Sequence, residues 1–139
     1  MAEQGAEPGG FRLVATHAIT NGALAAASDD ETVGAYFSYT NRAIQETLAL
    51  AKLTIGDIAW IVPQNMNARA WQILARLLKV DLERVAFPTL ASIGHVIAAD
   101  NIINLRHLLE RGAVRAGERV LLVMSGYGLN WQCVILERQ

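Results

Sequence analysis

The pattern of hydrophobic and polar positions along the chain predicts strands and helices in alternation. Short apolar runs, typical of strands, occur at 11–19, 58–63, 85–90, 120–125 and 129–137. Apolar residues at helical spacing predict helices over 35–53, 67–79 and 96–110. Almost wholly apolar strands such as 58–63 are usually covered on both faces. The order therefore predicts a layered α/β architecture with a five-stranded sheet.

The segments between these elements complete the expected organisation. The last two strands are close enough in sequence to pair as an antiparallel hairpin. Residues 20–34 read as a loop whose acidic residues, Asp29 to Glu31, are solvated. Residues 1–10 are polar and glycine-rich and are expected to form a flexible leader. Residues 11–139 are then a single domain.

Composition narrows the class of protein. The chain has 139 residues, of which 53% are hydrophobic and 18% charged, so either the core is large or some apolar surface meets a partner in an oligomer. The net charge of −1, without a basic patch, excludes nucleic acid as an expected partner. The single cysteine allows no internal disulfide and no cysteine-rich zinc site. No signal peptide or membrane-spanning run is visible, and we expect a cytoplasmic protein.

Candidate chemistry lies in three loops at the ends of predicted strands, "PQNMN", "SIGH" and "SGYG". Parallel strands would place Gln64 and His95 at one edge of the sheet, and Gly126 and Gly128 would let backbone approach them closely. Gln64 offers two N–H donors, and a neutral His95 at a helix start offers one. Two neutral donors directed at one point suit a thioester oxygen that gains negative charge.

Other polar groups have structural interpretations. On sequence pattern alone, a glutamine such as Gln64 after a strand most often caps the next helix or ties a loop. His17 and His107 are expected to be structural or solvated, and Cys133, which alternates with apolar neighbours, to be a small core residue. No carboxylate cluster has metal-ligand spacing, so neither a metal nor another cofactor is expected.

Three motifs in order resemble the C-terminal half of ketoacyl-acyl-carrier-protein synthase III, an enzyme of the thiolase fold. The family writes "VPHQANxR" where this chain has "VPQNMNAR", and "GNTSAAS" where this chain has "GHVIAAD". The segment "GAVRAGERVLLVMSGYGLNW" is similar to its glycine loop. The resemblance implies an α/β/α thiolase-like half with a mixed sheet whose last strand is antiparallel.

The resemblance also implies roles for individual residues. The catalytic His of the family falls on Gln64 and its catalytic Asn on His95, so amide and imidazole have changed places. Asn67 matches the Asn of the motif, and Gly126, Tyr127 and Gly128 match the substrate loop. Arg69 matches the Arg that helps to dock the acyl carrier protein or coenzyme A. The catalytic Cys belongs to an N-terminal half that has no counterpart in these residues.

Three hypotheses for function remain open. In the first, the chain is the C-terminal half or subunit of a synthase III-like acyltransferase or condensing enzyme, completed by a Cys-bearing N-terminal half. Gln64 does not titrate near neutral pH, so decarboxylative condensation is less expected than simple acyl transfer. In the second, the chain is a non-catalytic scaffold or regulatory partner. In the third, it forms a homodimer that copies the two-half architecture and binds acyl or coenzyme A ligands.

Overall fold

Four strands and three α-helices make up the computed structural model, which describes residues 9–126 and 129–139. All of the expected leader except its last two residues lies outside the described part of the chain. In chain order the elements are β1 (Phe11–Thr20), η1 (Gly22–Ala26), α1 (Asp29–Leu50), η2 (Ile55–Asp57), β2 (Trp60–Pro63), α2 (Ala68–Leu78), η3 (Leu82–Arg84), η4 (Ile97–Ala99), α3 (Asp100–Glu110), β3 (Arg119–Gly126) and β4 (Asn130–Arg138).

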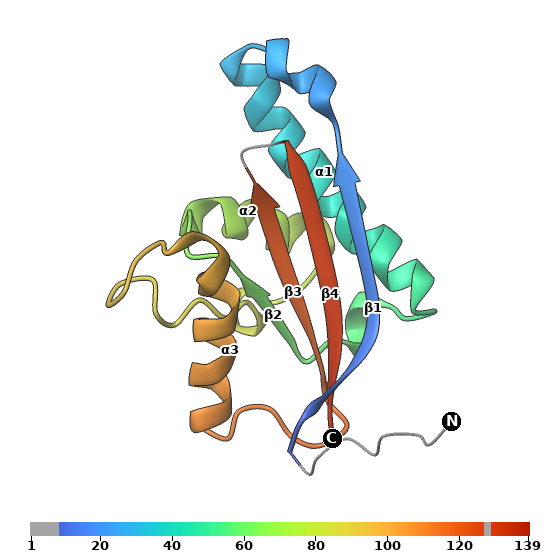
Figure 1. Ribbon diagram of the computed structural model, residues 1–139, viewed down its shortest axis with the longest axis vertical. Coiled ribbons are helices and arrows are strands. Elements are labelled where there is room, and N and C mark those ends of the chain that lie inside the picture. The colour runs from blue at the N-terminus through green and yellow to red at the C-terminus, as the bar shows by residue number, and fades with distance from the viewer. Residues whose placement is uncertain (1–8, 127–128) are drawn as a thin grey trace.

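The sheet is mixed, with the strand order β1-β4-β3-β2. β2 and β3 are parallel, and β4 is antiparallel to both of its neighbours. The predicted antiparallel pairing of the last two strands is therefore confirmed. Because β2 and β3 run in the same direction, the loops that follow them leave from the same edge of the sheet (Figure 1).

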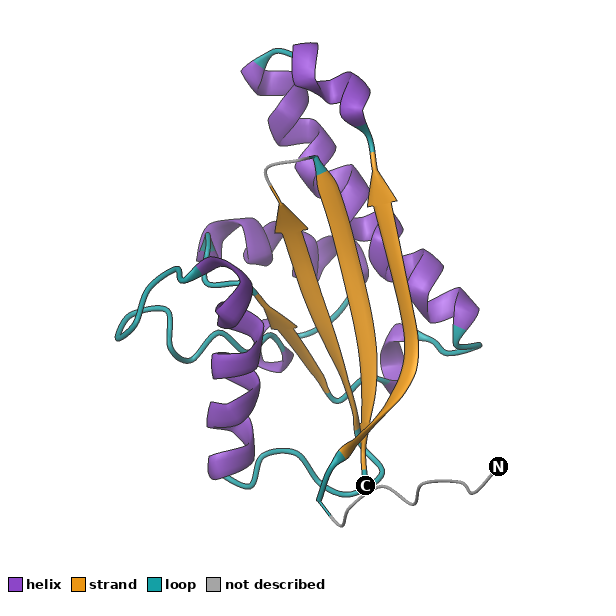
Figure 2. Ribbon diagram, viewed as in Figure 1, coloured by secondary structure: helices purple, strands orange, loops and turns teal. Residues whose placement is uncertain are grey.

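The prediction of a fifth strand at 85–90 is wrong. Only its first residues reach the sheet, through an isolated bridge between Val85 and Ile61 and a bond from Ala86 N to Ile61 O of 2.8 Å. Pro88 has no N–H to donate, and Leu90 N turns back to Phe87 O at 3.2 Å. The segment therefore continues as an irregular loop toward η4 (Figure 2).

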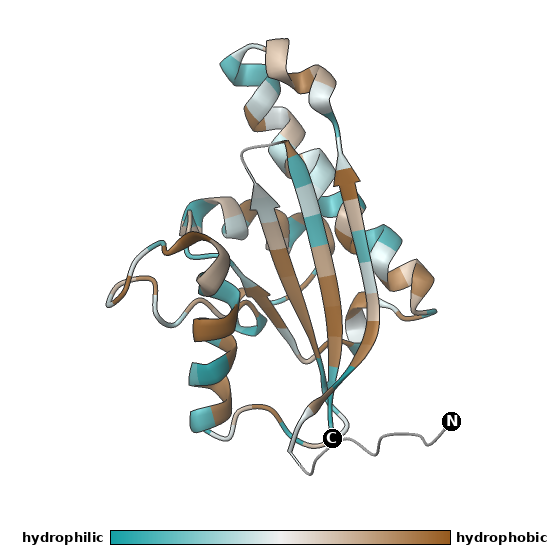
Figure 3. Cartoon of the chain, in the orientation of Figure 1, coloured by the Kyte–Doolittle hydropathy of each residue, from teal (hydrophilic) through white to brown (hydrophobic). Residues whose placement is uncertain are grey.

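Helices cover both faces of the sheet, as the predicted α/β/α layering requires. α1 and α2 pack on one face around Ile44, Leu74 and Leu121, and α3 packs on the other against β2 and β3 (Figure 1). Figure 3 shows β2 and β3 as largely hydrophobic, whereas hydrophilic positions recur along β4 toward its Asn130 end. The two apolar clusters thus meet at β2 and β3, and these two strands carry the candidate site at their carboxyl ends.

α1 begins earlier than its apolar pattern indicated. Ser28 caps it, accepting from Glu31 N at 3.3 Å while the Glu31 carboxylate accepts from Ser28 N at 2.8 Å. The bond from Ser28 N is the main reason that the pKa of Glu31 is lowered. The expected loop at Asp29 to Glu31 is therefore wrong, because these residues form the first turn of a helix, where carboxylates are favourable, whereas their exposure to solvent is as expected.

None of the helices in the described part of the chain combines the length and apolar character that a bilayer crossing requires.

Candidate functional site at the carboxyl ends of β2 and β3

Gln64 ties the end of β2 to the end of β3. Its Oε1 accepts from Ser125 N at 2.9 Å, and its Nε2 donates to Ile97 O at 3.4 Å. The residue is 8% exposed. Its amide therefore joins three segments that are distant in sequence, and the described residues engage one of its two N–H donors.

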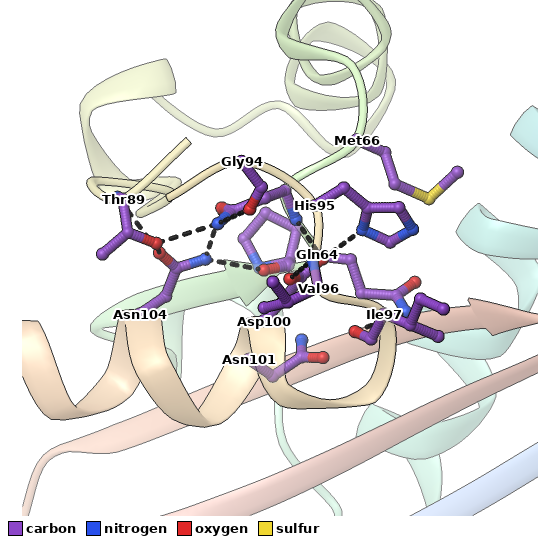
Figure 4. A network of polar contacts seen from close by, with 12 residues as sticks. Gln64, Met66, Thr89, Gly94, His95, Val96, Ile97, Asp100, Asn101 and Asn104 are labelled. Carbon is purple, nitrogen blue, oxygen red and sulfur yellow. Dashed lines mark hydrogen bonds and ion pairs between the residues drawn. The ribbon is translucent and has the colours of Figure 1, made fainter. Parts of the chain in front are cut away.

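Asn65, the next residue, is the centre of a buried amide network (Figure 4). Its Nδ2 donates to Thr89 Oγ1 at 2.8 Å and to Gly94 O at 3.0 Å, and its Oδ1 accepts from Asn104 Nδ2 at 2.8 Å. Asn104 also donates to Pro63 O at 3.2 Å. Neutral amides suit this place because each both donates and accepts, so a buried network is satisfied without a counter-charge.

Asp100 connects this network to His95. The carboxylate is wholly buried at the start of α3 and accepts from Asn65 N at 2.9 Å and from Val96 N at 2.7 Å. His95 Nδ1 is hydrogen-bonded to Asp100 Oδ2. In Figure 4 the His95 ring and the Gln64 side chain project to the same side of Asp100. The structure thus brings positions 64 and 95 to one edge of the sheet.

The hydrogen-bonding role available to His95 differs from the one expected. A neutral imidazole has a single N–H, and an ionised carboxylate can only accept, so the bond to Asp100 uses that N–H. The other ring nitrogen, Nε2, then carries a lone pair. A neutral His95 in this arrangement cannot donate from Nε2 to a thioester oxygen.

In the rest of the "VPQNMNAR" segment, Asn67 has a structural role and Arg69 lies on the surface. Asn67 is the N-cap of α2, and its side chain accepts from Arg69 N at 3.0 Å and from Ala70 N at 3.4 Å. Arg69 is exposed on the first turn of α2. Its guanidinium is therefore accessible to solvent near the candidate site.

Of the predicted glycine loop, Gly126 is described, whereas Tyr127 and Gly128 lie outside the described residues. Gly126 is the exposed last residue of β3. It lines a depression of about 320 Å³ together with Gln64, Ser125 and Ile97. Gln64 and the start of the glycine loop therefore share one concave surface.

Cys133 and the remaining histidines lie elsewhere. Cys133 is fully buried between α1 and the sheet, where burial raises the pKa of its thiol to about 12. His17 Nε2 lies 2.6 Å from Glu46 Oε2, and His107 is half-buried on α3. In the described residues, no three His, Cys, Asp or Glu side chains form a group that could hold a metal ion.

Asp100, Asn101 and Asn104 were missed as site residues, although all three are buried. Asn101 Nδ2 donates to Val62 O at 2.7 Å and to Val123 O at 3.0 Å, linking β2 to β3 from α3. The signal was present in "ADNIINLRHLL", where polar residues at i, i+1 and i+4 share the helix side that bears Leu105 and Leu108. Polar residues on a buried helix face indicate hydrogen-bonding partners across the interface.

Comparison with known proteins agrees with this architecture. The family model "3-Oxoacyl-[acyl-carrier-protein (ACP)] synthase III C terminal" matches residues 48–138. The chain is 37% identical over 91 residues to beta-ketoacyl-[acyl-carrier-protein] synthase III of Chlamydia caviae, matching 66% of this chain and 27% of that protein. The Rhodobacter capsulatus enzyme of the same name is 35% identical over 106 residues, which are 73% of this chain and 32% of that protein.

Solved structures give the same result. The 3-oxoacyl-(acyl carrier protein) synthase III of Pseudomonas aeruginosa PAO1 superposes with a TM-score of 0.79 at 26% identity, over 90% of this chain and 44% of that one. The corresponding Thermus thermophilus structure gives 0.81 at 25% identity, over 92% and 46%. The chain thus spans less than half of the length of these proteins. It belongs to the family of the C-terminal domain of 3-oxoacyl-[acyl-carrier-protein] synthase III.

Proposed function

We propose that this chain is the C-terminal half of a synthase III-like enzyme that transfers or condenses acyl groups, completed by a Cys-bearing N-terminal half in a cytoplasmic hetero-oligomer. The substrate is an acyl-carrier-protein or coenzyme A thioester, and the reaction needs no metal or other cofactor. The related proteins from Chlamydia caviae and Rhodobacter capsulatus are named as synthases that act with an acyl carrier protein.

One observation carries the proposal. Gln64 and His95 lie at one edge of the sheet, and Gln64 and Gly126 line a depression of about 320 Å³ there, in a chain of this family. In the proposed site the free Gln64 N–H and the backbone of the Gly126 to Gly128 loop stabilise the thioester oxygen. Removal of one such donor typically costs on the order of 10²–10³ in rate. Exposed Arg69 docks the carrier protein or coenzyme A through its guanidinium.

The nucleophile has to come from outside these residues. The only cysteine of the chain, Cys133, is buried, and its raised pKa keeps it a thiol. A neutral thiol is a poor nucleophile, and no acyl group can reach a fully buried sulfur. This supports the requirement for a second, Cys-bearing half.

The test is co-expression with an N-terminal half of the family that carries the cysteine. Intact-protein mass spectrometry after incubation with an acyl thioester is expected to show one acyl group on the cysteine of that half and none on Cys133. Arg69→Glu is expected to slow acylation from the carrier protein, with Arg106→Glu on the exposed side of α3 as the matched control. A purified complex that no acyl thioester acylates would exclude the enzymatic proposal.

A non-catalytic scaffold is the second candidate. It is favoured by the engagement of the Gln64 amide with Ser125 N and Ile97 O, which is a structural role in its own right. The scaffold predicts a stable complex that is never acylated while it alters the activity of another synthase. The same co-expression experiment therefore separates the two functions. A chain that associates only with itself and binds acyl ligands would support the homodimer instead.

A further inference from the structure

Asp100 holds the exposed imidazole of His95 from beneath the surface (Figure 4). The carboxylate is 0% exposed, whereas the His95 side chain is 39% exposed. Two backbone N–H groups, from Asn65 and Val96, bind the same carboxylate and fix its position. One ring nitrogen of His95 is therefore directed into the protein, and among the described residues none bonds to the other, Nε2.

This geometry selects one tautomer. In a neutral imidazole whose Nδ1 bonds to a carboxylate that accepts only, Nδ1 carries the proton and Nε2 carries the lone pair. A carboxylate that orients an imidazole through Nδ1–H and leaves Nε2 to accept a proton is the arrangement of a general base. A donor to an oxyanion would need the opposite tautomer.

We propose that His95 Nε2 is the general base of the thioester site, that Asp100 is its positioning residue, and that the reaction is acyl transfer to an acceptor bearing a thiol, hydroxyl or amine X–H. The proposal rests on the proposed function. It assigns to position 95 the proton transfer that the non-titrating Gln64 cannot perform.

The proposed step is balanced within the site. As the acceptor heteroatom bonds to the thioester carbonyl carbon, His95 Nε2 takes its proton. When the carbon–sulfur bond breaks, the proton passes from Nε2 to the leaving thiolate. The products are the acylated acceptor and the free thiol, and no oxidant, reductant or metal is consumed.

The Asp100 carboxylate also fixes the relative position of the Gln64 loop and the His95 ring. Its bond to Asn65 N fixes the loop that begins with Gln64, and its bond to His95 fixes the base. Gln64 would then stabilise the oxygen while His95 moves the proton. A single buried residue, Asp100, sets the relative position of both groups.

The rate of acyl transfer by variants of the complete complex shows whether His95 acts as a base or as a hydrogen-bond donor. His95→Gln and His95→Asn keep a neutral N–H donor but lose the base, and each is expected to lower the rate of acyl transfer at least 100-fold. His107→Gln, on α3, is the matched control and is expected to stay within twofold of the unmodified complex. Retention of the rate by either amide variant would overturn the base assignment.

The tautomer can be measured in the isolated chain, without any partner. ¹⁵N–¹H long-range spectra of the unmodified chain, at a pH where the ring is neutral, are expected to show His95 with the proton on Nδ1. An Nε2–H tautomer would overturn the proposal. Asp100→Asn is expected to abolish the preference, since an amide can donate to Nδ1. The unmodified chain gives the answer even if that variant fails to fold.

The two readouts distinguish the possible failures. If the complex is never acylated but His95 is the Nδ1–H tautomer, the proposed function is excluded. The arrangement of Asp100 and His95 is then still supported. Normal acyl transfer by His95→Gln leaves the proposed function and removes the base. An Nε2–H tautomer together with acylation restores His95 to the role of a donor.

Discussion

Cys133 shows how strongly the core controls a single side chain. Burial raises the pKa of its thiol from 9.0 to about 12, although a hydrogen bond with Thr47 acts in the opposite direction. The unfolded chain therefore releases this proton first, so the stabilising contribution is complete below about pH 9 and is lost as the pH rises toward about 12. At pH 10 the expected loss from this group is about 1.4 kcal/mol.

The measurement is urea unfolding at pH 8 and pH 10, for the unmodified chain and for Cys133→Ala. The variant is expected to be less stable at both pH values because of the cavity, but its loss between them is expected to be smaller by about 1.4 kcal/mol. Tyr36, whose pKa burial also raises, titrates in both chains and cancels in the comparison. Equal losses would show that the thiol is not held in the neutral state by the core.

Ile97 stores backbone strain beside the candidate site. Its φ is +57°, a left-handed conformation that a β-branched residue rarely adopts, and its side chain is 69% exposed. Because the Ile97 side chain is mostly exposed, its truncation loses little buried area. The backbone conformation therefore decides how a substitution changes the stability. Ile97→Gly is expected to be more stable than Ile97→Ala by about 1 kcal/mol in thermal or urea unfolding. At the neighbouring position, Ala98→Gly is expected to lower the stability. If glycine were less stable than alanine at position 97 as well, the strain at Ile97 would be contradicted.

At the scale of elements, Asn65 and Asn104 join the end of β2 to α3. Each is buried and bonded to the other, and their remaining bonds reach Thr89, Gly94 and Pro63. Asn104→Ala removes the partner of Asn65 Oδ1, of Pro63 O and of the Thr89 hydroxyl, and is expected to cost about 3 kcal/mol of unfolding free energy. A double-mutant cycle with Asn65→Ala is expected to give a coupling of about 1–3 kcal/mol. Arg106→Ala, exposed on the same helix, is the control, and additive effects of the two Asn variants would refute the network.

The elements also show what the sequence could and could not predict. Periodicity located α2, β3 and β4 because a single apolar face or run defines each of them. It failed at 85–90, where Pro88 and a turn end the pairing that an apolar run alone suggested. It placed Gln64 and His95 at one edge, but for a reason that failed, because the strand expected before His95 is an irregular loop and the bond to Asp100 holds the ring there. It did not reveal the bond between Asp100 and His95, because only the folded chain makes that contact.

At the scale of the whole molecule, one face of the sheet is only partly covered. α3 packs on β2 and β3, while the same face of β4 and β1 exposes Thr16, Ala18 and Gln132 to solvent in the described chain (Figure 1). Ile97 on η4 lines a depression together with Ala18 and Gln132 and is 69% exposed, and Ile102 on α3 is 60% exposed. Large apolar side chains that are exposed on the layer of a site are typical of a surface that a partner covers. This is the face on which the proposed Cys-bearing half is expected to dock.

Ile102→Glu tests that assignment. Complete burial of an isoleucine contributes about 1.5–3 kcal/mol, and a buried glutamate is unfavourable, so the dissociation constant of the complex is expected to rise at least tenfold. Ile73→Glu is the matched control, because Ile73 is 47% exposed on α2, in the opposite layer. Both variants are expected to keep the stability of the isolated chain, since neither side chain is in the core. Sedimentation of the co-expressed halves measures the affinity, and a loss of binding with Ile73→Glu alone would place the partner on the α1–α2 face.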